Sequence, residues 1–227
     1  YYIKEYEADS NANFSVLLDV SKSMGFASAG VTKLEYAKML AGCLTYLVHR
    51  QRDRVGLDAF DEEIVEHVPP SGKHMDTVLH MLDRLQPARP GNLRVPLHKM
   101  AEHFGRRGVL VVISDFYEEP DATVEALGPL RFRGNDLVVF HLLDPAELEF
   151  DFQDASAFED LESGEQIPIV PQALRDEYRR MIRAHIEAIA ERCKGARIDY
   201  TMLQTSQPLD HALFSYLSMR ERLMKAR

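Results

Sequence analysis

Asp19, Ser21 and Ser23 stand at alternate positions directly after an apolar run, and these residue types together could bind a hard cation. Carboxylate and hydroxyl oxygens are ligands that suit Mg²⁺ or Mn²⁺. The preceding residues, 14–18, predict a strand that is buried on both faces and stops where the polar residues begin. Open α/β sheets bind ligands outside the carboxyl ends of their strands, so the spacing predicts a cation site at this strand end.

A second predicted strand ends in the same way. Gly108–Ser114 is the most strand-like segment of the chain, and Asp115 follows it directly. In a doubly wound sheet the first strand lies beside the next parallel strand added on its other side, and a crevice opens where the winding reverses. We therefore expect Asp19 and Asp115 to meet at that point. Two close carboxylates repel each other, and a divalent cation between them would remove that cost.

The rest of the chain alternates between predicted strands and helices. Apolar residues at helical spacing predict helices over Lys33–Arg50, 75–85, 96–104, 122–130, 172–193 and 210–225, and apolar runs predict strands over 55–60, 64–68, 137–143 and 198–203. The polar turn at 61–63 indicates an antiparallel hairpin between its two neighbouring strands. This order predicts an α/β fold with a doubly wound, mostly parallel central sheet and helices on both faces.

Residues 144–170 do not fit the alternation. They are acidic and poor in helical periodicity, and Glu162-Ser163-Gly164-Glu165 separates two short strand-like runs, 158–161 and 166–170. This pattern predicts an inserted β-hairpin or flap. The length of 227 residues suits one large domain, which we expect to cover 1–227.

Composition excludes several classes of function. The formal net charge of −9 argues against a nucleic-acid partner, which needs a basic surface. No apolar run reaches the about 18–20 residues of a transmembrane helix, so we expect no transmembrane segment in this chain. Cys43 and Cys193 lie in predicted helices and suit buried thiols in a reducing compartment, which favours a cytoplasmic location.

Several motifs resemble a known superfamily. Asp19-x-Ser21-x-Ser23, together with the strand that ends in Ser114-Asp115, resembles the metal-ion-dependent adhesion site of von Willebrand factor A domains. Further segments look like the bacterial DUF58 branch: Tyr2-Ile-Lys-Glu-Tyr-Glu, Leu17-Leu-Asp-Val-Ser-Lys-Ser-Met, Asp53-Arg-Val-Gly-Leu with Phe60, and Leu161-Glu-Ser-Gly-Glu followed by Tyr178-Arg. The resemblance covers essentially the whole chain and implies a von Willebrand A fold.

The resemblance also implies a function and a ligand set. It suggests a protein-interaction module that docks an acidic side chain of another protein, with a MoxR-type AAA+ ATPase as the partner and a role in complex assembly. The family usually supplies a threonine from the loop before the third helix, whereas Gly91-Asn92 stands there in this chain. The expected ligands of Mg²⁺ or Mn²⁺ are therefore Asp19, Ser21, Ser23, Asn92 and Asp115.

Two other interpretations stay open at this stage. The serines could only cap a helix or close a turn, which would leave a metal-free scaffold with a degenerate site. Asp19 could instead be the nucleophile of a Mg²⁺-dependent phosphotransferase or hydrolase, but that chemistry requires a second aspartate where Ser21 stands. We therefore expect no enzyme activity. Asp58 interrupts an apolar strand on the same face as Phe60, and we interpret it as a hydrogen-bonded structural carboxylate.

Overall fold

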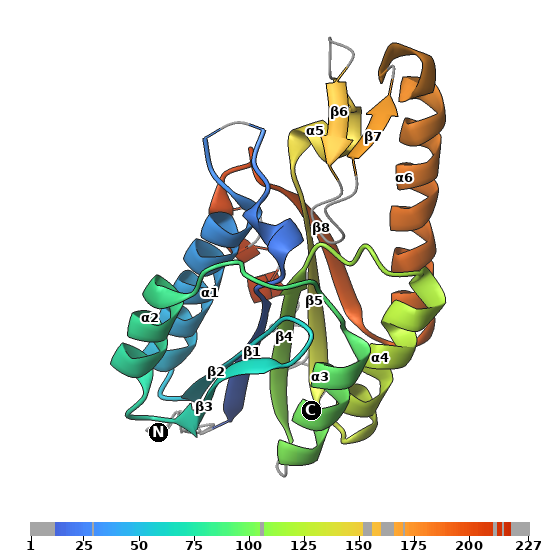
Figure 1. Ribbon diagram of the computed structural model, residues 1–227. Coiled ribbons are helices and arrows are strands. Elements are labelled where there is room, and N and C mark those ends of the chain that lie inside the picture. The colour runs from blue at the N-terminus through green and yellow to red at the C-terminus, as the bar shows by residue number, and fades with distance from the viewer. Residues whose placement is uncertain are drawn as a thin grey trace, which may run out of the picture.

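A six-stranded mixed sheet forms the centre of the molecule (Figure 1). The structure is a computed structural model that describes residues 12–28, 30–104, 107–151, 156–159, 166–169, 171–210, 213–214 and 216–218. The strands are β1 (Asn13–Asp19), β2 (Arg54–Phe60), β3 (Ile64–Ser71), β4 (Gly108–Ser114), β5 (Asp136–Leu143) and β8 (Asp199–Gln204), in the order β3-β2-β1-β4-β5-β8. Among the described strands of this sheet only β2 and β3 pair antiparallel, which confirms the predicted fold class and the hairpin between these two strands.

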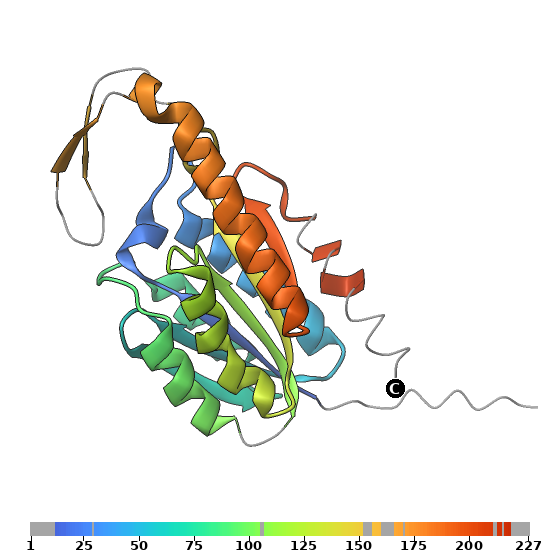
Figure 2. The same cartoon turned by 90° about the vertical axis from the view of Figure 1, so that its right-hand side faces the viewer.

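Helices cover both faces of this sheet, as Figures 1 and 2 show. On one face lie α1 (Lys33–Arg50) and α2 (Met75–Arg84), and on the other lie α3 (Arg94–His103), α4 (Pro120–Phe132) and α6 (Pro171–Gly195). Each face has its own hydrophobic core, because side chains of alternate strand residues point to opposite sides. None of the described helices is long and apolar enough to cross a bilayer.

The topology brings the ends of β1 and β4 together. The chain adds β2 on one side of β1 and later adds β4 on its other side. Leu18 is in register with Ile113 in the parallel pair, so Asp19 and Asp115 both emerge at the same edge of the sheet. This is the point where the winding reverses, as the sequence predicted.

The insertion after β5 contains one element that the sequence analysis missed. Residues Pro145–Glu149 form a short helix, α5, whereas we expected no helix between 144 and 170. Asp144 and Glu147 form a capping box at its start and Pro145 takes its first position, and these were the available signals. The predicted hairpin is confirmed as β6 (Ser156–Glu159) paired antiparallel with β7 (Gln166–Ile169).

Some expectations lie outside the described residues. They concern the opening segment before residue 12, the turn at 160–165 and most of the last predicted helix, 210–225.

Candidate metal-binding site

Asp19 is held rigidly at the end of β1. Its Oδ1 accepts a hydrogen bond from the backbone N–H of Ser21 at 2.8 Å, and its Oδ2 accepts one from the hydroxyl of Ser114 at 2.6 Å. Ser114 is the last residue of β4, so the second bond also joins the two strand ends. The carboxylate is therefore oriented by one bond from its own loop and one from the neighbouring strand.

The two predicted serine ligands lie together. Ser21 Oγ and Ser23 Oγ are 3.1 Å apart, and the 3₁₀ turn Lys22–Gly25 holds them on the same side of the loop. Ser21 is buried, whereas Ser23 is half-buried and brings the group toward the surface. The Asp19-x-Ser21-x-Ser23 spacing thus produces a compact set of oxygens at the strand end.

The loop before α3 closes over these serines. The backbone N–H of Lys22 donates to the carbonyl of Arg89 at 2.7 Å. A Cβ atom added at Gly91 would lie only 2.9 Å from Ser21 Cβ and 3.3 Å from Ser21 Oγ, so glycine is needed for this approach. Asn92 caps the first turn of α3, since its Oδ1 accepts from the N–H of Val95 at 3.0 Å. Gly91 therefore lets the loop approach Ser21 more closely than a residue with a Cβ would allow.

Asp115 is bound by a buried lysine. Lys33 Nζ lies 2.7 Å from Asp115 Oδ2 and 2.6 Å from Glu147 Oε1, and the Lys33 side chain is 0% exposed. Burial alone would lower the pKa of Lys33, but the two carboxylates outweigh burial and raise it above its ordinary value. Lys33 therefore links the start of α1, the end of β4 and the helix α5.

Asp19 has no such cation beside it in the described part of the chain. Burial, and then the negative charge of Asp115, raise the pKa of Asp19 from 3.8 to about 7, although hydrogen bonds from Ser114 and Ser21 oppose the shift. The ionised form of this carboxylate is therefore destabilised unless a positive charge is added.

These residues fit a hard divalent cation. Asp19, which has no counter-charge among the described residues, forms an oxygen set with the two converging hydroxyls and with Asp115 after the next strand. Mg²⁺ and Mn²⁺ prefer oxygen ligands of this kind. Within the described ranges no group of three or more His, Cys, Asp or Glu side chains is placed to hold a metal ion, so the candidate site depends on serine hydroxyls as well as on carboxylates.

Comparison with known proteins places the chain in a family. The sequence pattern described as "Protein of unknown function DUF58" matches residues 1–188. The chain belongs to the DUF58 family. Uncharacterized proteins of Mycobacterium bovis and Mycobacterium tuberculosis are 25% identical to this DUF58 chain over 230 residues, which is 97% of the chain and 71% of each relative.

Solved structures share the fold at low identity. BatB from Bacteroides thetaiotaomicron superposes with a TM-score of 0.63 at 18% identity, covering 92% of this chain and 99% of BatB. An aerotolerance-related membrane protein from Bacteroides fragilis gives 0.63 at 19%, covering 88% and 94%. The SpRpn10 VWA domain gives 0.50 at 11%, covering 86% and 89%. This DUF58 domain therefore has a von Willebrand A-like fold, as its motifs predicted.

Two charged residues of the DUF58 domain were not foreseen. Lys33 and Glu147 lie at the candidate site, but neither belongs to a recognised motif. One signal was present for Lys33, because Thr32 and Glu35 form a capping box and place this lysine in the first turn of α1. A cation is unfavourable beside the positive end of a helix dipole, which indicates that another charge compensates it.

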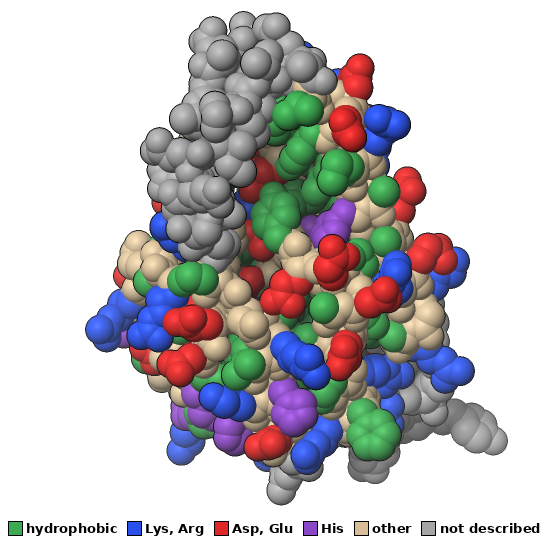
Figure 3. All heavy atoms as spheres, turned by 45° about the vertical axis from the view of Figure 1, so that its right-hand side comes forward, with side chains coloured by type: hydrophobic (Ala, Val, Ile, Leu, Met, Phe, Trp, Pro, Cys, Tyr) green, Lys and Arg blue, Asp and Glu red, His purple; other side chains and the backbone are tan. Residues whose placement is uncertain are grey.

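Aromatic side chains lie beside the acidic centre. Phe150 stacks on Tyr178 with ring centroids 4.3 Å apart, and Lys33 Nζ lies 4.9 Å from the ring centroid of Tyr117. Figure 3 shows hydrophobic side chains beside a hollow on this face of the molecule, with acidic side chains deeper in it.

Asp58 has the structural role that we expected. Its Oδ1 lies 2.6 Å from Nδ1 of His67 on β3, and it shares the sheet face of Phe60. It thus belongs to the β2–β3 hairpin and not to the set of oxygens around Asp19.

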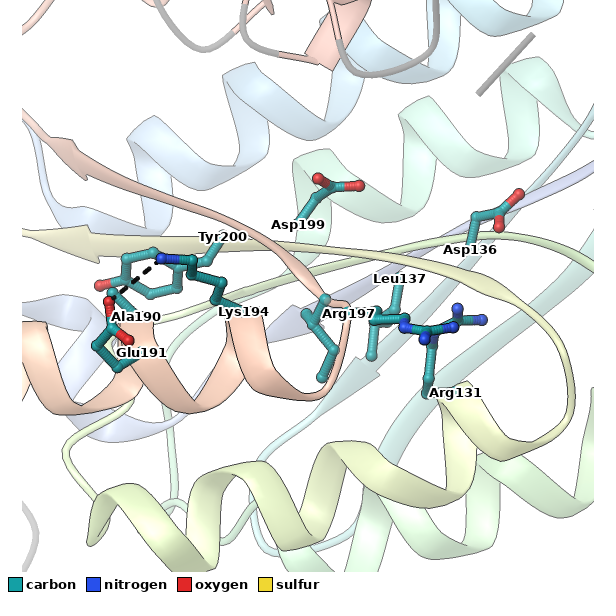
Figure 4. A pocket seen from close by; sticks show the side chains of 10 residues that line it. Arg131, Asp136, Leu137, Ala190, Glu191, Lys194, Arg197, Asp199 and Tyr200 are labelled. Carbon is teal, nitrogen blue, oxygen red and sulfur yellow. Dashed lines mark ion pairs between the residues drawn. The ribbon is translucent and has the colours of Figure 1, made fainter. Parts of the chain in front are cut away.

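A second hollow, of about 570 Å³, lies at the opposite end of the sheet (Figure 4). It is lined by the ends of α4 and α6 and the starts of β5 and β8. Its lining contains both signs of charge, including Arg131, Asp136 and the Glu191–Lys194 pair, whose charged atoms are 3.7 Å apart. The mixed charges favour no single class of ligand.

Proposed function

We propose that this domain is a protein-interaction module, and not an enzyme, in which Mg²⁺ or Mn²⁺ at the end of the sheet binds an acidic side chain of a partner protein. The observation that carries the proposal is Asp19, a buried carboxylate with no counter-charge among the described residues, beside the paired hydroxyls of Ser21 and Ser23. Asp19, Ser21, Ser23 and Asp115 would hold the cation, and Asn92 stays a predicted further ligand.

The bound cation would supply an open coordination position for a carboxylate oxygen of the partner. The protein's own groups orient the site, since Ser114 and the Ser21 N–H fix both oxygens of Asp19. The half-buried Ser23 and the hollow in Figure 3 support access from outside. Hydrophobic side chains beside the hollow would pack against residues next to the partner's carboxylate.

The DUF58 resemblance supports a MoxR-type AAA+ ATPase as the partner, acting with this domain in complex assembly. This part of the proposal comes from the family and not from the geometry of the site.

The geometry gives little support to the phosphotransferase alternative. Ser21 occupies the position of the second aspartate and its hydroxyl faces Ser23. We therefore infer no phosphoryl transfer at this site.

Metal binding and partner capture test the proposal together. Mn²⁺ titrated calorimetrically into the full chain should bind wild type and the exposed-site control Asp76→Ala, but not Asp19→Ala. The same substitution, or EDTA, should abolish capture of a purified MoxR-type ATPase. Capture that survives both treatments would favour a metal-free scaffold. Turnover of p-nitrophenyl phosphate that needs Mg²⁺ and is lost in Asp19→Asn would favour the enzyme.

A further inference from the structure

Lys33 lies at the candidate site but is not one of its oxygen ligands, so its role needs a separate explanation. A lysine that is fully buried must be paired, because an isolated ammonium ion is costly to remove from water. Its two partners come from different elements, Asp115 after β4 and Glu147 in α5. Among the described residues, Lys33 forms ion pairs with Asp115 and Glu147 but not with Asp19.

Hydrogen bonds fix Glu147 beside the site, so its negative charge contributes to the net charge of the site. Its Oε2 accepts from the backbone N–H of Asp144 at 2.8 Å, while Oε1 binds Lys33. Asp144 is itself buried and accepts from the N–H of Ser28 at 3.0 Å and from the N–H of Ala146 at 2.8 Å. The capping box of α5 therefore holds a third carboxylate at the site, linked to Asp115 through Lys33.

The charges then decide which ligand the metal-loaded site accepts. The carboxylates of Asp19, Asp115 and Glu147 together with the ammonium of Lys33 carry two negative charges, which a divalent cation cancels. Without Lys33 the three carboxylates and the bound divalent cation would together carry one negative charge. Like charges at close range disfavour association, so a carboxylate would then be repelled.

We propose that Lys33 is the residue that makes this site selective for carboxylate ligands, by neutralising Glu147 and holding Asp115. The inference rests on the proposed function, since it concerns the same metal-loaded site. Lys33 acts through the two carboxylates and is a specificity-determining residue, not a ligand of the metal.

A charge-balancing role and a purely structural role predict different results for four proteins. These are wild type, Lys33→Met, Glu147→Gln and the double variant, each as the full chain. Mn²⁺ affinity is measured by calorimetry, and binding of [¹³C]acetate is measured from the paramagnetic broadening of its carboxylate signal by protein-bound Mn²⁺. Thermal melting monitored by circular dichroism reports folding of each protein.

Lys33→Met should bind Mn²⁺ at least as tightly as wild type and acetate about tenfold more weakly. Removing the excess negative charge in the double variant should restore acetate binding, and Glu147→Gln alone should bind acetate more tightly than wild type. The matched control is Lys38→Met on the same helix, because Lys38 contacts only the carbonyls of Asp83 and Leu85 among its described hydrogen-bond partners. This control should leave both affinities unchanged.

The possible failures are distinguishable. If wild type takes up no Mn²⁺, the proposed function fails and this inference fails with it. If wild type binds Mn²⁺ and acetate while Lys33→Met binds acetate equally well, only the inference is overturned. Should Lys33→Met not fold, Glu147→Gln decides, since unchanged acetate affinity in that variant would also overturn it.

Discussion

Replacing Asp19 with asparagine should stabilise the metal-free domain, and the gain should grow as the pH rises. Asparagine has nearly the same shape, its Oδ1 can accept from the Ser21 N–H, and its amide can donate to Ser114 Oγ after the hydroxyl rotates. The substitution thus removes a buried charge with little loss of hydrogen bonding.

The magnitude follows from the shift of the Asp19 pKa from 3.8 to about 7. A carboxyl group whose pKa is raised in the folded state contributes stability below pH 3.8, and this contribution is lost as the pH rises through 7. Between pH 5 and pH 8 the free energy of unfolding of wild type should therefore fall by about 3 kcal/mol relative to Asp19→Asn.

Urea unfolding in EDTA at pH 5, 6, 7 and 8 measures this difference directly. Other titrating groups are common to both proteins and cancel in the comparison. Mg²⁺ at 100 times its dissociation constant should stabilise wild type by about 3 kcal/mol relative to metal-free wild type, and so offset most of the advantage of Asp19→Asn at high pH. Parallel pH profiles of the two proteins in EDTA would refute the electrostatic reasoning.

Three further predictions follow from particular contacts. Gly91→Ala should displace Ser21 and weaken Mn²⁺ binding, measured by calorimetry, whereas Gly72→Ala should not, since nothing lies within 4 Å of its added Cβ. Burial lowers the pKa of His141 from 6.5 to about 3. Between pH 7 and pH 5 the free energy of unfolding of wild type should therefore fall by about 2 kcal/mol more than that of His141→Gln. Urea unfolding in EDTA measures this difference, and an equal fall in both proteins would contradict the prediction. Thr32→Ala should cost about 1 kcal/mol in the same assay at pH 7, because its side chain caps α1.

The fold could be predicted largely because its signals are local. β1 and β4 were recognisable in the sequence as continuous apolar runs. A strand that is covered on both faces does not need alternating polar and apolar residues. The short helix α5 was missed because five residues are too few for a periodic pattern, although Asp144, Pro145 and Glu147 carried a capping signal.

Part of the candidate site could likewise be predicted from the sequence, and part could not. Asp19, Ser21 and Ser23 lie within five positions, so their convergence depends on one loop, and Asp115 follows from the winding rule for parallel sheets. Asn92 was chosen for its side-chain oxygen and stays a predicted ligand; the structure adds that this oxygen accepts from the N–H of Val95 and that Gly91 is the loop residue where a Cβ would meet Ser21. The sequence alone does not show which residue of the loop before α3 approaches Ser21 most closely.

By itself, then, the sequence determined the α/β fold, its DUF58 motifs and the loop of oxygens after β1. Only the tertiary structure decided the charge of the site, since Lys33 pairs with residues 82 and 114 positions away. Hydrophobic periodicity and turn chemistry act over a few residues and can be read along the chain. The pairing of buried charges depends on where distant elements meet, and no local pattern encodes that meeting.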